Sequence, residues 1–140
     1  MKESRIKFRA KSRRTGEWIY GDLMHAGTSP NDDEYEILYW DEESGWMQDK
    51  ILPDTVCQFT GLHDKDGHEI YVEDIIELGL GRHKVQYIIT PTTFTAITYM
   101  AHSCKDGDSV ELWQIETETK YIKVIGNYYD NPELRFNKKD

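Results

Sequence analysis

The sequence predicts an all-β protein with little helix. Short β-branched and aromatic runs are separated by Gly, Asp and Asn turn signals at roughly every ten to fifteen residues. Several of these runs also alternate between apolar and polar residues, which is the period of a half-buried strand. About ten short strands of this kind favour small sheets or barrels.

The N-terminal half is expected to contain two hairpins and a fifth strand. Turn residues at 14–17 close the first hairpin, and those at 41–45 close the second. A polar loop over residues 26–34 separates the hairpins, and Pro53 interrupts the chain after the second one. The expected strands cover residues 6–11, 18–24, 35–40, 46–51 and 55–60.

The C-terminal half is expected to continue as strands. Asp66-Gly67 is a strong hairpin dipeptide, and further turns are expected at 79–81 and 106–107. Residues 109–120 fit a short helix about as well as a strand. Pro132 is expected to open one closing helical turn, because proline is favoured at the first helical position. The expected strands cover residues 74–78, 84–90, 94–100 and 121–126.

Length and composition restrict the class of protein. A chain of 140 residues suits one domain or two small lobes. With 38% hydrophobic and 12% aromatic residues the chain is too apolar to be disordered. The net charge of −9 excludes a generically basic nucleic-acid binder, and the composition excludes a collagen-like repeat or a cysteine scaffold. No apolar run approaches the roughly 18 residues that a membrane span needs.

Positive charge is concentrated at the N-terminus. Met1–Arg14 carries seven basic residues and one acidic residue, so it is +6 while the remainder is −15. Alternation in the expected first strand puts the basic and apolar residues on opposite faces. The basic set is Arg5, Lys7, Arg9 and Lys11, and the apolar set is Ile6, Phe8 and Ala10. The basic face could follow a phosphate backbone. We favour a solvated face, or cations that pair with carboxylates of a neighbouring strand or subunit.

No catalytic motif is present in the sequence. It has no Walker loop, dinucleotide fingerprint, nucleophile elbow or zincin helix, and nothing nominates a nucleophile. Cys57 and Cys104 are far apart in the sequence, and residues 1–10 do not contain the apolar segment of a secretion signal, so we expect both thiols to be reduced. We expect the two side chains to pack as small buried hydrophobes. We therefore expect a non-enzymatic protein without a cofactor. An enzyme with an unrecognised site is the least favoured alternative.

The loop around Asp66 resembles a calcium-binding loop only in part. With Gly67 at the invariant glycine, Asp64, Asp66 and Glu73 fall on ligand positions, but the first position is Leu62, which offers no side-chain oxygen. A tight hairpin turn explains the same residues better. The five histidines do not form the closely spaced pairs of a structural zinc site. We therefore expect no bound metal.

Three stretches of the sequence together resemble one known family. They are residues 6–10 (IKFRA), 58–76 (QFTGLHDKDGHEIYVEDII) and 124–134 (VIGNYYDNPEL). In this order they resemble the YopX-like family of phage and prophage proteins over almost the whole chain. The sequence departs from the family pattern at Val72-Glu73-Asp74, where the family has an acidic residue followed by Gly-Asp. The loss of that glycine makes this turn the expected point of difference.

The resemblance implies a β-rich N-terminal lobe over residues 1–60 and an SH3-like barrel lobe over 61–140. One compact domain formed by both lobes is the alternative. The resemblance also implies an origin in a phage or prophage and a cytoplasmic location in the bacterial host. It supplies no catalytic residues. We interpret the motif residues as determinants of turns and strands. These residues are Phe59, Gly61, Gly67, Ile70, Asp74, Gly126, Asn131 and Pro132.

We expect this protein to be a homo-oligomeric assembly or interaction module. The basic N-terminal strand and the acidic patches at 32–36 and 41–43 are complementary surfaces, which favours head-to-tail contact between copies. Surplus aromatic residues could fill such an interface. The candidate interaction residues are Arg5, Lys7, Arg9, Lys11, Asp33, Glu34 and Glu36. Alternatives are a host or phage protein partner, a nucleic-acid-associated accessory role, or an acidic DNA mimic that binds a host protein.

Overall fold

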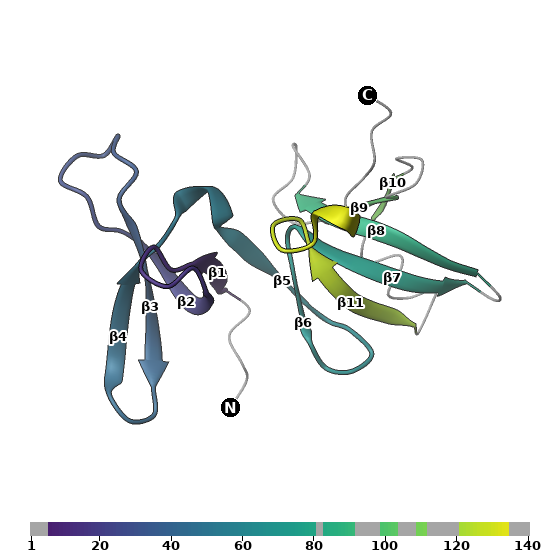
Figure 1. Ribbon diagram of the computed structural model, residues 1–140, viewed down its shortest axis with the longest axis horizontal. Coiled ribbons are helices and arrows are strands. Elements are labelled where there is room, and N and C mark those ends of the chain that lie inside the picture. Colours follow the sequence, from purple (N-terminus) through teal and green to yellow (C-terminus); the bar gives the residue numbers. More distant parts are fainter. Residues whose placement is uncertain (1–5, 81–82, 92–98, 104–108, 112–120, 135–140) are drawn as a thin grey trace. The chain divides into compact units, whose positions relative to one another are not determined.

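Strands dominate the computed structural model, which describes residues 6–80, 83–91, 99–103, 109–111 and 121–134 (Figure 1). The helical elements among these residues are two short 3-10 turns, η1 (Pro53–Thr55) and η2 (Pro132–Leu134). The all-β class predicted from the sequence is confirmed. The chain divides into two compact units, residues 1–59 and 60–140, which are described separately.

The first unit is built from antiparallel hairpins. Its strands are β1 (Phe8–Lys11), β2 (Trp18–His25), β3 (Tyr35–Asp41), β4 (Gly45–Lys50) and the first residues of β5 (Cys57–His63). Their order is β4-β3-β2-β1-β5. Both predicted hairpins are present, because β1 pairs with β2 and β3 pairs with β4. β5 begins two residues later than predicted, since Thr55 belongs to η1 and its hydroxyl donates to the Leu52 carbonyl.

The core of the first unit lies against one face of these strands. Ala10, Ile37 and Ile51 are fully buried, and Phe8 and Ile19 pack against them. Ala10 lies opposite Ile19 in the β1–β2 register, so the apolar positions of the two strands share a face. The alternation read from the first strand therefore places Phe8 and Ala10 in this core.

Backbone contacts join the end of β1 to the end of β4. Ser12 forms an isolated antiparallel bridge with Ile51. The Arg13 N–H donates to the Lys50 carbonyl at 2.8 Å, and the Leu52 N–H donates to the carbonyl of Lys11. The chain that follows β1 therefore covers the C-terminal end of β4.

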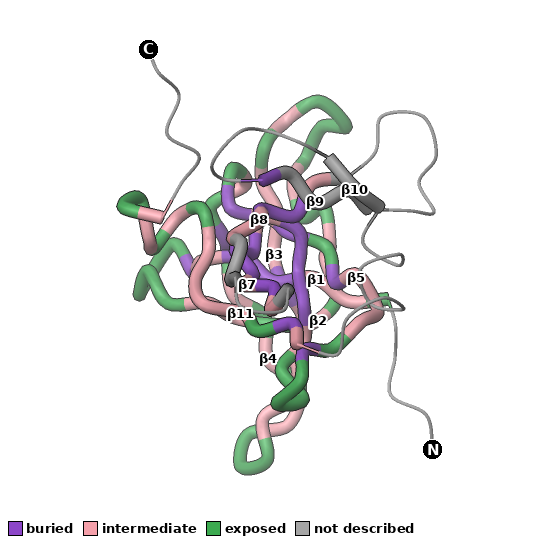
Figure 2. Tube along the Cα trace, turned by 90° about the vertical axis from the view of Figure 1, so that its right-hand side faces the viewer, coloured by how far each residue is buried: buried purple, intermediate pink, exposed green. Residues whose placement is uncertain are grey.

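The second unit contains a five-stranded antiparallel sheet. β5 continues into this unit and pairs with β6 (Glu69–Tyr71). The sheet order is β10-β9-β8-β7-β11. Its strands are β7 (Asp74–Leu80), β8 (His83–Pro91), β9 (Tyr99–Ser103), β10 (Ser109–Glu111) and β11 (Ile122–Asn127). The core of this unit is aliphatic and consists of Ile70, Ile76, Leu78, Ile89 and Ile122. Buried residues line β7, whereas the hairpin that contains β4 ends in exposed residues (Figure 2).

One prediction for the second unit needs correction, and a second is tested only in part. The prediction that a turn begins at Gly79 is wrong, because β7 continues through Gly79 and Leu80. The Gly79 N–H donates to the Tyr121 carbonyl at 3.0 Å, which holds this segment straight. The expected strand at 94–100 begins at Tyr99 among the described residues, and residues 92–98 lie outside them.

The remaining predictions for the second unit fall partly outside the described residues. Residues 109–111 are a strand, and 112–120 lie outside the description, as does the turn expected at 106–107. The closing turn is confirmed, with Pro132 at its first position.

Glu73 occupies the corner between β6 and β7 with a left-handed backbone (φ 75°). Among the described residues it is the one non-glycine residue with a positive φ. The Glu73 N–H donates to the Ile89 carbonyl, and the Glu73 carbonyl accepts from the Tyr128 N–H. These two bonds hold a conformation that glycine adopts at lower cost. This is the position where the resembled pattern has glycine.

Candidate interaction surface

The cations in β1 and directly before it lie over aromatic rings of their own unit. The Arg9 guanidinium lies 4.5 Å from the centroid of the Trp18 ring, and the Lys11 ammonium lies 5.4 Å from the same centroid. Lys7 lies 5.3 Å from the ring centroid of Phe59. Arg9 is only 5% exposed. The face of β1 that carries the cations is therefore partly covered by aromatic side chains, and each contact adds cation–π stabilisation.

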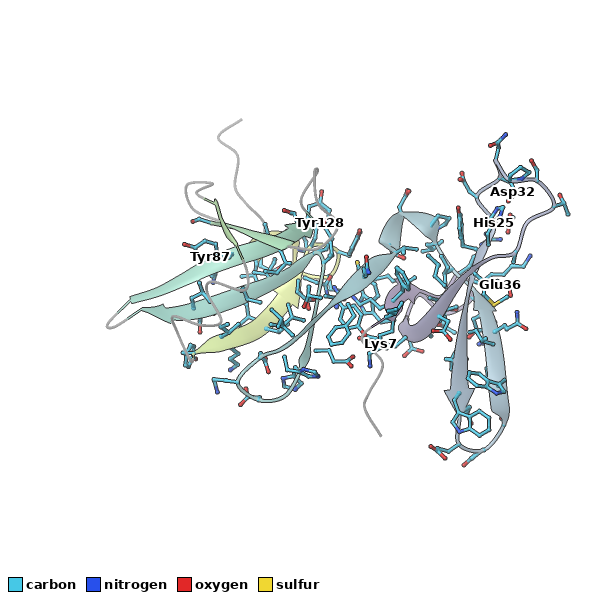
Figure 3. All side chains as sticks on the ribbon, turned by 180° about the vertical axis from the view of Figure 1, so that it is seen from behind. Lys7, His25, Asp32, Glu36, Tyr87 and Tyr128 are labelled. Atoms are coloured by element: carbon cyan, nitrogen blue, oxygen red, sulfur yellow. The ribbon has the colours of Figure 1, made fainter. Side chains whose placement is uncertain are left out.

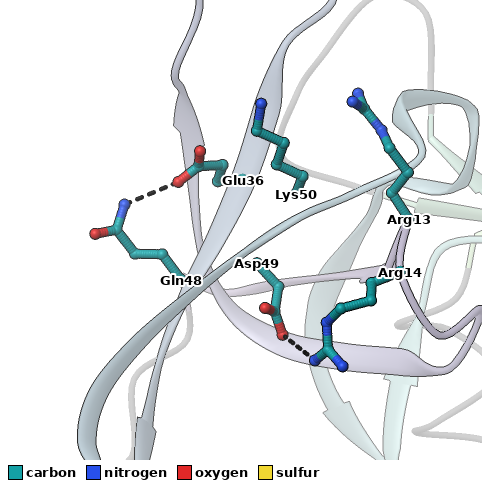
Figure 4. Close-up of a pocket in the computed structure, with 6 residues that line it drawn as sticks. All are labelled: Arg13, Arg14, Glu36, Gln48, Asp49 and Lys50. Atoms are coloured by element: carbon teal, nitrogen blue, oxygen red, sulfur yellow. Dashed lines mark hydrogen bonds and ion pairs between the residues drawn. The ribbon is translucent and has the colours of Figure 1, made fainter.

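A charged hollow of about 530 Å³ opens beside the C-terminal end of β4 (Figure 4). Its lining residues are Arg13, Arg14, Glu36, Gln48, Asp49 and Lys50. Arg14 Nη2 lies 3.8 Å from Asp49 Oδ2, and the Gln48 amide donates to Glu36 Oε1 at 2.8 Å. Asp49 also accepts a hydrogen bond from the Tyr39 hydroxyl, which raises the pKa of Tyr39 above its ordinary value of 10.0. The hollow therefore presents both donors and acceptors to solvent.

Of the three acidic residues predicted for the interaction surface, Glu36 lines this hollow and Glu34 pairs with two of its lining cations. Glu34 Oε2 lies 3.2 Å from Arg13 Nη2 and 3.9 Å from Lys50 Nζ. Glu36 lies opposite Lys50 in the β3–β4 register. Asp33 is exposed in the loop before β3. Glu34 therefore pairs with one cation that follows β1 and with another at the end of β4.

An aromatic pair lies on the outer face of the β3–β4 hairpin. Trp40 and Trp46 are directly opposite in the register, with ring centroids 5.4 Å apart at an interplanar angle of 79°. They lie on the face opposite to that of buried Ile37, because alternate residues of β3 point to opposite faces. Trp40 is 56% exposed and Trp46 is 63% exposed. The two indoles therefore present their surfaces to solvent.

Several residues of this surface were not singled out from the sequence. From the sequence, Trp40 and Trp46 belong to the surplus aromatic residues that could fill an interface, but their pairing is not predicted. Arg13 and Arg14 count only toward the basic segment 1–14, and Lys50 counts only toward the total charge. The pairing of Trp40 with Trp46 and of Glu36 with Lys50 follows from the register once the turn at 41–45 is fixed. The strand register is therefore the feature of the sequence from which these two pairs could have been predicted. Arg5 lies outside the described residues.

Asp32 organises the loop between β2 and β3. Its Oδ2 accepts the N–H groups of Thr28 (2.9 Å) and Ser29 (3.0 Å), and its Oδ1 lies 2.8 Å from His25 Nε2 (Figure 3). The hydrogen bond from the Ser29 backbone is the largest of the effects that lower the pKa of Asp32 below 3.8. The carboxylate also lies against Gly27, where a Cβ would overlap it. The loop is therefore a self-contained turn built around one carboxylate.

Asp64 organises the loop between β5 and β6 in the second unit. Its Oδ1 accepts the N–H groups of Asp66 and His68, both at 2.9 Å, and its Oδ2 accepts the N–H of Val124 at 3.0 Å. The side chain is fully buried. Burial acts to raise the pKa of Asp64, but the hydrogen bonds from Val124, His68 and Asp66 outweigh it and lower the pKa below 3.8. This carboxylate ties the loop to β11.

Asp64, Asp66 and His68 are close enough to hold a metal ion, with potential ligand atoms within 4.8 Å of one another. Both oxygens of Asp64 already accept backbone N–H groups, and Asp66 lies 3.1 Å from Lys65 Nζ. The cluster is therefore explained by the hairpin turn and its local ion pair, without a metal.

The motif residues of the β5–β6 region occupy turn and core positions. Phe59 and Ile70 are buried. Gly61 and Gly67 both have φ of 87°, which side-chain-bearing residues rarely adopt. Asp74 is buried and accepts the N–H of Tyr71 at 2.7 Å.

The closing motif forms a second tight turn. Gly126 follows an irregularity in the β11–β7 pairing, and a Cβ there would lie 2.5 Å from Asn131 Oδ1. That oxygen accepts the Asn127 N–H at 3.0 Å, and Pro132 opens η2 directly afterwards. Gly126 therefore allows the Asn131 side chain to cap the end of β11.

Comparison with known proteins identifies the family. Curated proteins gave no match. A crystal structure of protein EF1440 from Enterococcus faecalis has a similar fold, with a TM-score of 0.57 and 20% sequence identity over 94% of this chain and 98% of that one. Within the described residues no helix has the length and apolar character needed to cross a membrane. The family profile described as YopX protein matches residues 7–134, so the chain belongs to the YopX family.

Proposed function

We propose that this chain is a non-enzymatic assembly module that associates with copies of itself through its β3–β4 hairpin. The observation that carries the proposal is the edge-to-face, solvent-facing pair of Trp40 and Trp46. Tryptophan is enriched at protein interfaces and depleted elsewhere on surfaces. Two adjacent indoles that are each more than half exposed therefore mark a contact surface.

The charges around the hairpin support a protein partner over a nucleic acid. Arg13 and Lys50 lie near Glu34, and Arg14 lies near Asp49. A phosphate backbone would have to compete with these carboxylates in a chain of net charge −9. A protein surface that carries both signs of charge can satisfy cations and carboxylates together.

Further parts of the proposal come from the family. The resemblance to phage and prophage proteins supports a role in the cytoplasm of a bacterial host. It also supports an SH3-like arrangement for residues 61–140. A host or phage protein is the alternative partner if the chain does not associate with itself.

The test is the solution mass of the full chain by size-exclusion chromatography with light scattering, over a range of concentrations. We expect a discrete multiple of 16.5 kDa. The double variant Trp40→Ser/Trp46→Ser should shift the mass toward the monomer, whereas Leu52→Ser, which alters an exposed apolar residue outside the hairpin, should not. A wild-type monomer at all concentrations would contradict the proposal.

A further inference from the structure

β4 has one edge that is not paired with β3. It is the last strand in the sheet order. The Ile51 N–H donates to the Tyr35 carbonyl at 3.1 Å, so these two residues face each other through their backbone groups. Alternation along an antiparallel ladder then turns the backbone groups of Trp46, Gln48 and Lys50 away from β3.

The chain itself covers one end of that edge. The Lys50 carbonyl accepts the N–H of Arg13. Among the described residues no strand pairs with the rest of this edge, so the segment of β4 that can receive another strand is the part around Trp46 and Gln48. This open segment lies between the hairpin turn at 41–45 and the charged hollow.

The most exposed charges of the hollow are positive. The side chains of Arg14 and Lys50 are 73% and 60% exposed, whereas that of Asp49 is 17% exposed. The ion pairs of these two cations are long, at 3.8 Å for Arg14–Asp49 and 3.9 Å for Lys50–Glu34, whereas Arg13–Glu34 is shorter at 3.2 Å. Exposed pairs of this length contribute little, so the cations can reorient toward a new carboxylate.

The opposite end of β4 carries a rigid acidic turn. Asp41 Oδ1 accepts the N–H groups of Glu43 (2.8 Å) and Ser44 (3.0 Å), and Gly45 supplies the positive φ that completes the turn. Glu42 and Glu43 are exposed. One hairpin therefore has carboxylates at one end of β4 and cations at the other.

We infer that two copies of this chain pair their β4 edges antiparallel, so that the acidic turn of each copy enters the charged hollow of the other. Antiparallel pairing about a two-fold axis places the start of one β4 beside the end of its partner. Both charge contacts form at once, and the Trp46 side chains lie along the same seam. This inference rests on the proposed self-association and specifies its site.

The test uses two variants that each carry a single sign of charge along the seam. Glu42→Lys/Glu43→Lys makes the turn and the hollow both positive, and Arg13→Glu/Arg14→Glu makes them both negative. Each variant alone should associate about tenfold or more weakly than wild type, because like charges meet at both contacts. An equimolar mixture should recover association, since each turn then meets a hollow of opposite charge.

Recovery in the mixture also shows that both variants are folded. Glu133→Lys is the control, because it reverses an exposed charge in the second unit and should leave association unchanged. If the wild type associates but the charge variants do so equally well, or if the mixture does not recover, the docking of turn into hollow is wrong while self-association stands. A discrete oligomer with an odd number of copies would overturn the two-fold pairing. A monomeric wild type would overturn both proposals.

Discussion

The two aspartate-centred loops use the same chemistry for different purposes. Asp32 in the first unit accepts backbone N–H groups that are at most four residues away, and its side chain is 28% exposed. Asp64 in the second unit accepts two local N–H groups and that of Val124, 60 residues away, and its side chain is fully buried. The sequence separation of the hydrogen-bonded residues and the burial of the carboxylate differ between the two loops. We infer that a local, partly exposed carboxylate stabilises one turn, whereas a buried one that reaches a distant strand stabilises the whole unit.

The largest effect in this comparison is expected for the substitution Asp64→Ala. Removing the carboxylate leaves three backbone N–H groups without their acceptor, so we expect a loss of about 3 kcal/mol in the free energy of unfolding. Urea unfolding measures this loss. The matched control is Asp66→Ala in the same loop, where only an exposed pair with Lys65 is removed and about 0.5 kcal/mol or less is expected. Equal losses for both variants would show that Asp64 does not act as a long-range clamp.

The next effect is the pH dependence of stability. The folded pKa of Asp64 is below the ordinary value of 3.8, so its stabilisation is present above about pH 4 and is lost as the pH falls through the folded pKa. We expect Asp64→Asn to be less stable than wild type by about 1–2 kcal/mol at pH 7. The difference should shrink in thermal unfolding below pH 4. A constant difference from pH 7 to pH 3 would contradict the role of the charge.

A smaller effect, an increase in the free energy of unfolding, is expected when Glu73 at the β6–β7 corner is replaced. Glu73→Gly relieves the left-handed backbone, so the free energy of unfolding should rise by up to about 1 kcal/mol. Glu73→Ala keeps the strain and removes only the side chain, so it separates the two causes. If Ala and Gly have the same effect, backbone strain does not contribute at this corner.

The smallest effect is expected for Asp32→Ala, the counterpart of the first variant. Its bonds are local and partly exposed, so global unfolding should change less than for Asp64→Ala. Hydrogen exchange should instead accelerate at the amides of Thr28 and Ser29. A loss of global stability equal to that of Asp64→Ala would remove the distinction between the two loops.

Much of the first unit was predictable because its contacts are local. The two hairpins follow from alternating strands and from turn residues at 14–17 and 41–45. The position of Gly79 within β7 was not predictable from the sequence. Glycine usually indicates a turn, and here the hydrogen bond from the Gly79 N–H to the Tyr121 carbonyl keeps it in a strand. The candidate surface was only half predicted, since Glu34 and Glu36 were named individually, whereas Trp40 and Trp46 were included only among the surplus aromatic residues.

By itself, the sequence determined the all-β class, the hairpins of the first unit and the YopX family, because these depend on residue types at short or fixed spacing. The tertiary structure alone decided which charges meet. It brought Arg13 to Lys50 through a backbone hydrogen bond, and it brought the Val124 N–H to the Asp64 carboxylate. Such contacts depend on how strands close onto one another, which a periodic pattern along one strand does not encode.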